Sequence, residues 1–236
     1  MNNLWVFGDS YSTYNRERGS TPLSIYNRVA NHLTLEQKNH SISGLSNPDI
    51  FTNLLRFLSE YKKGDYIIFQ LSFLDRFSYI DVRQSKELNL HELSLYSVSD
   101  NFFLHPQYYH NGLQNELTER QIQSFNVFAE NIQLNLFDFY YKFFTQLNHI
   151  VNFLNNNEIN FKIVILENLN MDYNGESISL HSLLNETNLS KYILNFDESD
   201  TLKTSKFYFE IGEYEYHHFT RDVIDRIAEQ IKNNFR

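Results

Sequence analysis

Short apolar runs alternate with helical patterns of apolar positions in the first third of the chain. The runs Leu4 to Phe7 and Tyr66 to Leu71 are apolar and rich in β-prone residues, which predicts two buried strands. A shorter strand is expected near Asn39 to Ile42. Apolar residues at helical spacing predict helices over Leu23 to Leu33 and Pro48 to Tyr61. The order strand, helix, strand, helix, strand is typical of an α/β domain with a parallel sheet.

The remaining two thirds of the chain depart from this alternation of strands and helices and then resume it. Residues from about 78 to 115 are polar, aromatic and poorly periodic, which predicts a loop-rich insertion such as a lid or binding loop. Apolar positions three and four residues apart from Leu117 to Asn155 predict one long helix or two helices with a bend. Phe161 to Leu166 is a fourth expected strand, and Phe207 to Ile211 is a fifth strand or a loop. A final amphipathic helix is expected over Thr220 to Phe235.

Length and composition favour one globular domain over residues 1–236. The chain has 236 residues, which fits a single core, and no linker or internal repeat divides it. Hydrophobic residues make up 42% and aromatic residues 16%, which excludes a disordered chain and hints at a ligand pocket. The formal net charge is −9 without a basic stripe, so nucleic acid is not an expected partner. There is no cysteine, which excludes disulfides and thiolate metal sites.

The hydropathy of the chain also bears on where it acts. The longest apolar runs are too short to span a bilayer, so no membrane span is expected. Met1 to Val6 lacks the charged region and cleavage site of an export signal. We expect a soluble protein of the cytoplasm, or of a phage particle; secretion directed by a leader outside this sequence stays open.

Gly8, Asp9 and Ser10 interrupt the first strand and present the first candidate chemistry. Parallel-sheet enzymes gather their reacting groups at the carboxyl ends of strands, and a serine on such a turn is exposed and held still. Ser10 is therefore a candidate nucleophile. The alternative is a strand-to-helix turn in which Asp9 or Ser10 only caps a helix.

A candidate base lies just before the last expected helix, where His217 and His218 follow one another. Hydrolysis through a serine needs a group that takes its proton and a partner that orients that group. Glu215 stands three residues before His218, so one tight turn would point its carboxylate at the imidazole. The alternative is that both histidines are ordinary surface residues.

These blocks, in their order along the chain, resemble the SGNH (GDSL-type) hydrolases. Members of that family carry Gly-Asp-Ser after the first strand, a glycine after the second, Gly-x-Asn-Asp after the third and Asp-x-x-His before the last helix. Here the corresponding blocks are Phe7 to Ser10, Ser43-Gly44, Gln70 to Phe77 and Glu215 to His218. The resemblance covers nearly the whole chain.

The resemblance implies a three-layer, flavodoxin-like SGNH-hydrolase fold with about five parallel strands, and a role for each matching residue. Ser10 would be the nucleophile and would also donate its backbone N–H to the oxyanion, with Gly44 as a second backbone donor. His218 would act as general base and then as acid, and Glu215, in place of the usual aspartate, would orient it. Asp9 is expected to be structural, joining loops beside Ser10.

The third block departs most from the family pattern. When it is aligned on Asp75, the usual glycine falls on Ser72 and the oxyanion-binding asparagine falls on Leu74, which cannot donate a hydrogen bond. A lost donor of this kind typically costs about 2.7–4 kcal/mol of transition-state stabilisation. Either another donor replaces it, with Ser72 or Asn47 as candidates, or the chain is slow or inactive. Asp75 and Arg76 are alternatively an ion pair that fixes the loop.

These features together predict a serine esterase. It would remove an acyl group, with acetyl as the leading choice, from a carbohydrate or other small ester through a Ser10, His218 and Glu215 triad. No metal is expected, because His91 and the other histidines of the insertion lack compact ligand spacing. No organic cofactor is expected, and the sequence carries no Gly-rich phosphate loop or dinucleotide fingerprint. One alternative is an O-acyltransferase acting on a surface polysaccharide, which would use the same acyl-enzyme. The other, favoured by Leu74, is a catalytically impaired glycan-binding relative.

Overall fold

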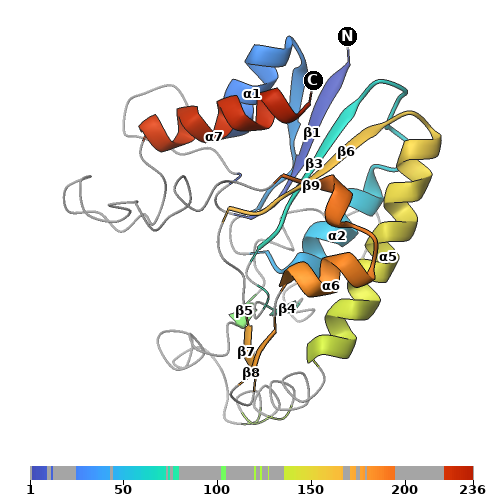
Figure 1. Cartoon of the computed structure of the whole chain (residues 1–236), viewed down its shortest axis with the longest axis vertical. Coiled ribbons are helices and arrows are strands. Elements are labelled where there is room, and N and C mark those ends of the chain that lie inside the picture. The colour runs from blue at the N-terminus through green and yellow to red at the C-terminus, as the bar shows by residue number, and fades with distance from the viewer. Residues whose placement is uncertain are drawn as a thin grey trace.

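The computed structural model of the chain is shown in Figure 1. It describes residues 2–9, 12, 25–42, 45–72, 74, 77–79, 102–104, 120, 123, 127, 136–166, 171–173, 176–178, 180–194 and 221–235. All structural statements below concern these residues.

A five-stranded parallel sheet forms the centre of the molecule. Its strands are β1 (Asn3–Phe7), β2 (Glu36–Asn39), β3 (Tyr66–Gln70), β6 (Asn160–Val164) and β9 (Ile193–Leu194), in the order β2-β1-β3-β6-β9. Every pair in this sheet is parallel. The order is that of a flavodoxin-like sheet, in which the direction of winding reverses between the first and third strands along the chain. The expected α/β fold with about five parallel strands is confirmed.

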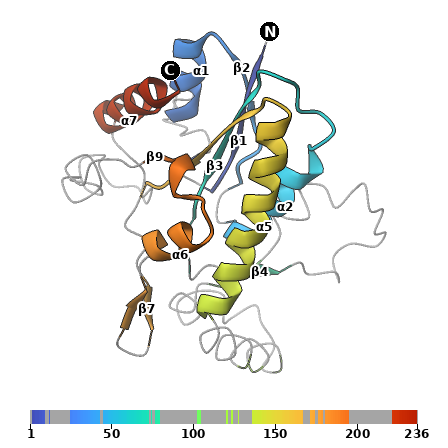
Figure 2. The same cartoon turned by 45° about the vertical axis from the view of Figure 1, so that its right-hand side comes forward.

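Helices cover both faces of this sheet, which gives three layers (Figures 1 and 2). On one face lie α1 (Ile25–Leu33) and α7 (Arg221–Asn234), which contact each other. On the other lie α2 (Asn47–Arg56), α5 (Leu136–Asn156) and α6 (Leu180–Glu186). Each helix turns an apolar stripe towards the sheet, as the helical spacing of α1, α2, α5 and α7 in the sequence predicts.

The alternation of side chains along β1 shows why this strand is central. Trp5 and Phe7 belong to the core shared with α2 and α5, whereas Leu4 and Val6 belong to the core shared with α1 and α7. All four side chains are buried, since both faces of the parallel sheet are covered. Full burial of side chains of this size stabilises the fold by roughly 1.5–3 kcal/mol each.

Two antiparallel pairs and a short 3-10 helix complete the described elements. β4 (Phe77–Tyr79) pairs with β5 (Phe102–Leu104), and β7 (Met171–Tyr173) pairs with β8 (Glu176–Ile178). The 3-10 helix spans Ser190–Tyr192 and leads directly into β9. Of the expected insertion, at about 78 to 115, the structure describes only residues 78–79 of β4 and 102–104 of β5.

Three expected elements differ from the structure in position. β2 ends at Asn39, where the expected strand begins, but the pairing continues beyond it: the N–H of His40 donates to the Val6 carbonyl at 2.8 Å, and that of Ile42 to the Gly8 carbonyl at 3.1 Å. α2 ends at Arg56, and residues 57–60 form turns in place of the expected final helical turn. The fifth strand is β9, while the segment expected to supply it, 207–211, lies outside the described residues.

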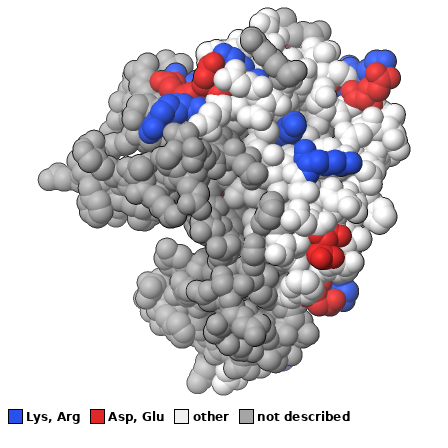
Figure 3. Space-filling model, viewed as in Figure 1, with Lys and Arg blue, Asp and Glu red and all other residues white. Residues whose placement is uncertain are grey.

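Two surface properties can be stated for the described ranges. None of their helices combines the length and the apolar character that a membrane crossing requires. On the face shown in Figure 3, lysine, arginine, aspartate and glutamate side chains occur in small groups, several of which contain both signs.

Candidate active site

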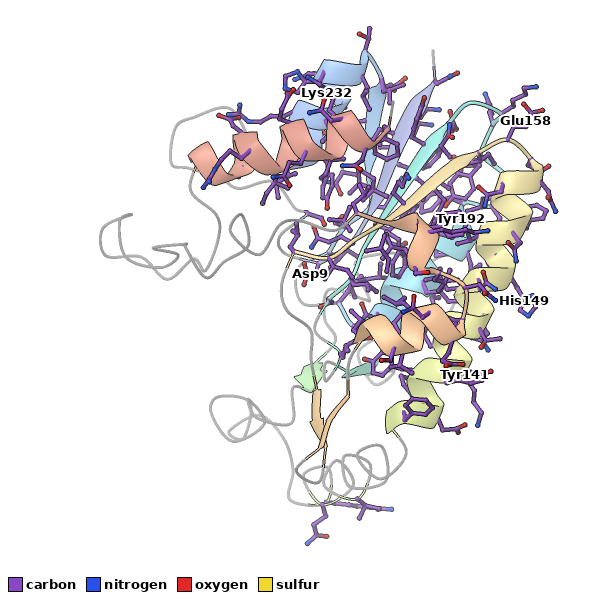
Figure 4. The ribbon with its side chains drawn as sticks, in the orientation of Figure 1. Asp9, Tyr141, His149, Glu158, Tyr192 and Lys232 are labelled. Carbon is purple, nitrogen blue, oxygen red and sulfur yellow. The ribbon has the colours of Figure 1, made fainter. Side chains whose placement is uncertain are left out.

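The candidate site begins where β1 and β3 end, side by side in the sheet. These two strands flank the point at which the direction of winding reverses, and ligands of open α/β sheets bind beyond the carboxyl ends of the strands at such a point. Figure 4 shows Asp9 at this end of the sheet, away from Glu158 in the turn that precedes β6. The side chains described next all gather around Asp9.

Asp9 is a buried carboxylate that joins the two strand ends. Only 1% of its surface is exposed. Gln70, the last residue of β3, donates from Nε2 to Asp9 Oδ1 at 2.8 Å. Ser72 donates from Oγ to Asp9 Oδ2 at 2.9 Å. A buried carboxylate is tolerated only when donors satisfy its oxygens, and each oxygen of Asp9 accepts one of these two bonds.

The opposite side of the Gln70 amide accepts two hydroxyl groups. Ser12 donates from Oγ to Gln70 Oε1 at 2.5 Å, and Tyr26 of α1 donates from its hydroxyl to the same oxygen at 2.8 Å. Burial raises the pKa of Tyr26 above its ordinary value of 10.0; the hydrogen bond with Ser12 opposes this, and the charge of Asp9 adds to it. Tyr26 therefore keeps its proton and acts as a donor.

A tight turn follows β1, and its two ends are both fixed. The N–H of Ser12 donates to the Asp9 carbonyl at 3.0 Å, and Asn39 donates from Nδ2 to the Ser12 carbonyl at 2.6 Å. Gly8 has to lack a side chain here, because a Cβ would lie 2.2 Å from Ser12 Oγ and 2.9 Å from Gln70 Cβ. The turn is thus held from β2 as well as from β3.

The loop after β3 is fixed by Asn47 at the start of α2. Asn47 Oδ1 accepts the N–H of Ser72 at 2.8 Å, and Asn47 Nδ2 donates to the Ser72 carbonyl at 3.0 Å. Since Ser72 also donates its hydroxyl to Asp9, both of its donors bind groups within the protein. Ser72 would donate to an oxyanion, as expected from the sequence, only after releasing one of these partners.

Leu74, which stands where the family has its oxyanion-binding asparagine, belongs to the core. Its side chain is buried among the residues that pack under α5, and its carbonyl accepts the hydroxyl of Tyr140. This carbonyl therefore faces the helix α5, and the side chain offers no donor.

The remaining site residues expected from the sequence lie outside the described residues. They are Ser10, Gly44, Asp75, Arg76, Glu215 and His218. Their neighbours along the chain are described: Ser10 stands between Asp9 and Ser12, and His218 precedes α7 by three residues.

Sequence reasoning missed the hydrogen-bonding roles of Gln70, Ser12, Tyr26 and Asn39. Gln70 carried a usable signal, because it is the one polar side chain in the run Ile67 to Leu71. A polar group at the end of a buried strand needs partners, which points to a polar cluster at that end. Ser12 and Asn39 carried no such signal, since polar residues are common in turns and at strand ends.

The described part of the chain contains no group of three or more histidine, aspartate or glutamate side chains arranged to hold a metal ion. No protein-family model matches the chain, and no curated protein matches it.

Proposed function

We propose that the protein is a serine esterase that removes an acyl group, acetyl being the leading choice, from a carbohydrate or another small ester. The observation that carries the proposal is the buried hydrogen-bonded network on both sides of Ser10. Asp9 before it and Ser12 after it are buried and bound to the same side chain, that of Gln70. Enzymes with parallel sheets bind their ligands beyond the carboxyl ends of the strands, and the hydrogen bonds at the end of β1 would hold a nucleophile in a fixed position.

In this proposal, residues of the chain carry out every step of the reaction. Ser10 attacks the ester carbonyl carbon while His218 takes the proton from its hydroxyl, and His218 then returns that proton to the departing alcohol. Water, activated by the same histidine, releases the acyl group from Ser10. Glu215 orients the imidazole and stabilises its charged form.

Backbone N–H groups would stabilise the oxyanion by donating hydrogen bonds to it. The N–H groups of Ser10 and Gly44 are the proposed donors, and neither Leu74 nor the already bonded Ser72 adds a third in the described arrangement. Because one lost donor typically costs about 2.7–4 kcal/mol of transition-state stabilisation, we expect a slow esterase.

One observation favours a second candidate, a glycan-binding relative with impaired catalysis. Leu74 is buried in the core, so its side chain is not free to contact a substrate. In that case the hydrogen bonds of Asp9 and Ser12 would serve only to shape a binding surface.

Hydrolysis of a chromogenic acetyl ester separates the two candidates. The esterase predicts turnover by the wild type that disappears in Ser10→Ala and persists in Ser59→Ala, a matched change at an exposed serine in the turn after α2. Equal background rates in the wild type and Ser10→Ala, with acetylated glycan still bound, would support the non-catalytic relative instead.

A further inference from the structure

We propose that Gln70 is the positioning residue of the proposed nucleophile: its amide binds Asp9 and Ser12, which flank Ser10 in the sequence, and thereby raises the reactivity of Ser10. This inference rests on the proposed function, although the fixing of the turn can be tested without any catalysis.

The position of Gln70 in the sheet brings it to both ends of the turn. Phe7 of β1 is in register with Phe69 of β3, so Gln70 stands beside Gly8, where the absence of a side chain leaves room for it. The Gln70 side chain is fully buried. From there it reaches Asp9 on one side and Ser12 on the other.

One end of the turn needs a hydrogen-bond donor and the other needs an acceptor, and a side-chain amide provides both groups. Asp9 is an acceptor and takes the Nε2 donor, whereas the hydroxyls of Ser12 and Tyr26 are donors and take Oε1. An apolar side chain of the same size would satisfy neither end. A glutamate would satisfy the hydroxyls but would bring a second carboxylate to the 2.8 Å that now separates the Asp9 oxygen from the amide nitrogen.

Only two residues of the sequence, Ser10 among them, separate the two groups that Gln70 binds. A displacement of about 1 Å in a reacting group costs roughly 10²-fold in rate. The hydroxyl of Tyr26 adds a tie from α1, which makes the Gln70 oxygen a junction between this helix, β3 and the turn. Loss of the amide would therefore release the turn while leaving the sheet register intact.

The test compares two nearly isosteric changes, Gln70→Met and Gln37→Met. Gln37 lies on the neighbouring strand β2, and within the described part of the chain neither atom of its amide has a hydrogen-bond partner. We expect Gln70→Met to slow labelling of Ser10 by a fluorophosphonate about 10²-fold. It should also speed deuterium exchange of the Ser12 N–H, while Gln37→Met leaves both rates unchanged.

The decisive variant exchanges the two partners, as Asp9→Asn with Gln70→Glu. Residue 9 then carries the amide, which donates to residue 70 and accepts from Ser72, and residue 70 carries the carboxylate, which accepts from Ser12 and Tyr26. Every hydrogen bond of the network is kept, and only the one between residues 9 and 70 reverses its direction. The double variant should exchange deuterium at Ser12 more slowly, and label faster, than either single variant.

Different results would contradict the positioning role of Gln70 and the proposed function. Unchanged Ser12 exchange in Gln70→Met, or no recovery in the double variant, would overturn the positioning role. If Gln70→Met does not fold, recovery in the double variant relative to its two single variants decides the question. A wild type that never reacts with the fluorophosphonate would contradict the proposed function. The deuterium exchange rates of the Ser12 N–H would still show whether Gln70 fixes the turn.

Discussion

Asn47 and Ser72 exchange two hydrogen bonds at the carboxyl edge of the sheet: the Asn47 side chain accepts the Ser72 N–H at 2.8 Å and donates to the Ser72 carbonyl at 3.0 Å. The side-chain amide of Asn47, at the start of α2, thereby binds the backbone N–H and carbonyl of Ser72. A neighbouring strand would otherwise have to bind these two groups. Both residues are buried, so no solvent replaces these bonds when they are lost.

Replacement of Asn47 by alanine should therefore destabilise the protein. It removes both hydrogen bonds of Asn47 with the buried backbone of Ser72, and the loss of a buried partner costs about 1–3 kcal/mol. We expect urea denaturation to show a fall of about 2 kcal/mol or more in the free energy of unfolding. Asn31→Ala, at an exposed position of α1, is the matched control and should change stability little. Equal effects of the two changes would show that the Asn47 contacts carry no stability.

A methyl group at Gly8 should damage both stability and the site. Its Cβ would overlap Ser12 Oγ and crowd Gln70 Cβ, and overpacking of this kind costs about 1–3 kcal/mol. Gly64→Ala is the informative control, because Gly64 has a φ of +85° that an alanine adopts only with a cost of about 1–2 kcal/mol. Gly64 precedes β3 and so lies at the far end of the sheet.

Thermal unfolding and ester hydrolysis together distinguish these two glycines. Both alanine variants should melt earlier than the wild type. Only Gly8→Ala should lose activity among molecules that remain folded. A Gly8→Ala variant with wild-type turnover would contradict the tight contact between the turn and β3.

His40 should make stability depend on pH. It stacks on Trp5 and Phe7, and burial lowers its pKa from 6.5; Glu60 opposes the shift, while Lys38 and Arg56 add to it.

The unfolded chain therefore binds this proton at a higher pH than the folded chain does. Stability from this group is complete above about pH 6.5 and is lost as the pH falls through the unfolded value towards the lower folded one. Urea denaturation between about pH 7.5 and about pH 5.5 should show this loss, reduced in His40→Gln and kept in His149→Gln, where the histidine is exposed. The same pH dependence in both variants would exclude His40 as its source.

Two phenylalanines on α5 test which face of that helix forms the core. Phe144 is fully buried, whereas Phe153 is 50% exposed. Phe144→Ala should lower the free energy of unfolding by about 3–5 kcal/mol. Phe153→Ala should cost about 1 kcal/mol or less. Similar losses, measured by denaturant unfolding, would mean that the apolar stripe of α5 faces another way.

Much of the fold follows from local pattern. The apolar runs that become β1 and β3 are buried on both faces, so their hydrophobic character is nearly continuous and easy to detect. The polar strand β2 is less visible, because an edge strand with the sequence Glu36 to Asn39 owes its structure to pairing with β1 and not to its own composition. The two-residue strand β9 is too short to produce any pattern of its own.

Of the candidate site, only the part at the carboxyl end of β1 was predictable from the sequence. Gly8 and Asp9 interrupt an apolar run, which indicates a turn at the carboxyl end of β1. The partners of Asp9 come from residues about sixty positions away, so nothing in the local sequence specifies them. Which hydroxyl meets which amide depends on the packing of β3 and α1 against β1, and that is a property of the assembled fold.

The most direct test of the central claim is mass spectrometry of the intact protein after reaction with a fluorophosphonate, followed by peptide mapping. We predict one adduct per chain, located on Ser10, that is absent from Ser10→Ala and retained in Ser59→Ala. An unmodified wild type, or an adduct that persists in Ser10→Ala, would contradict an activated nucleophile at the end of β1.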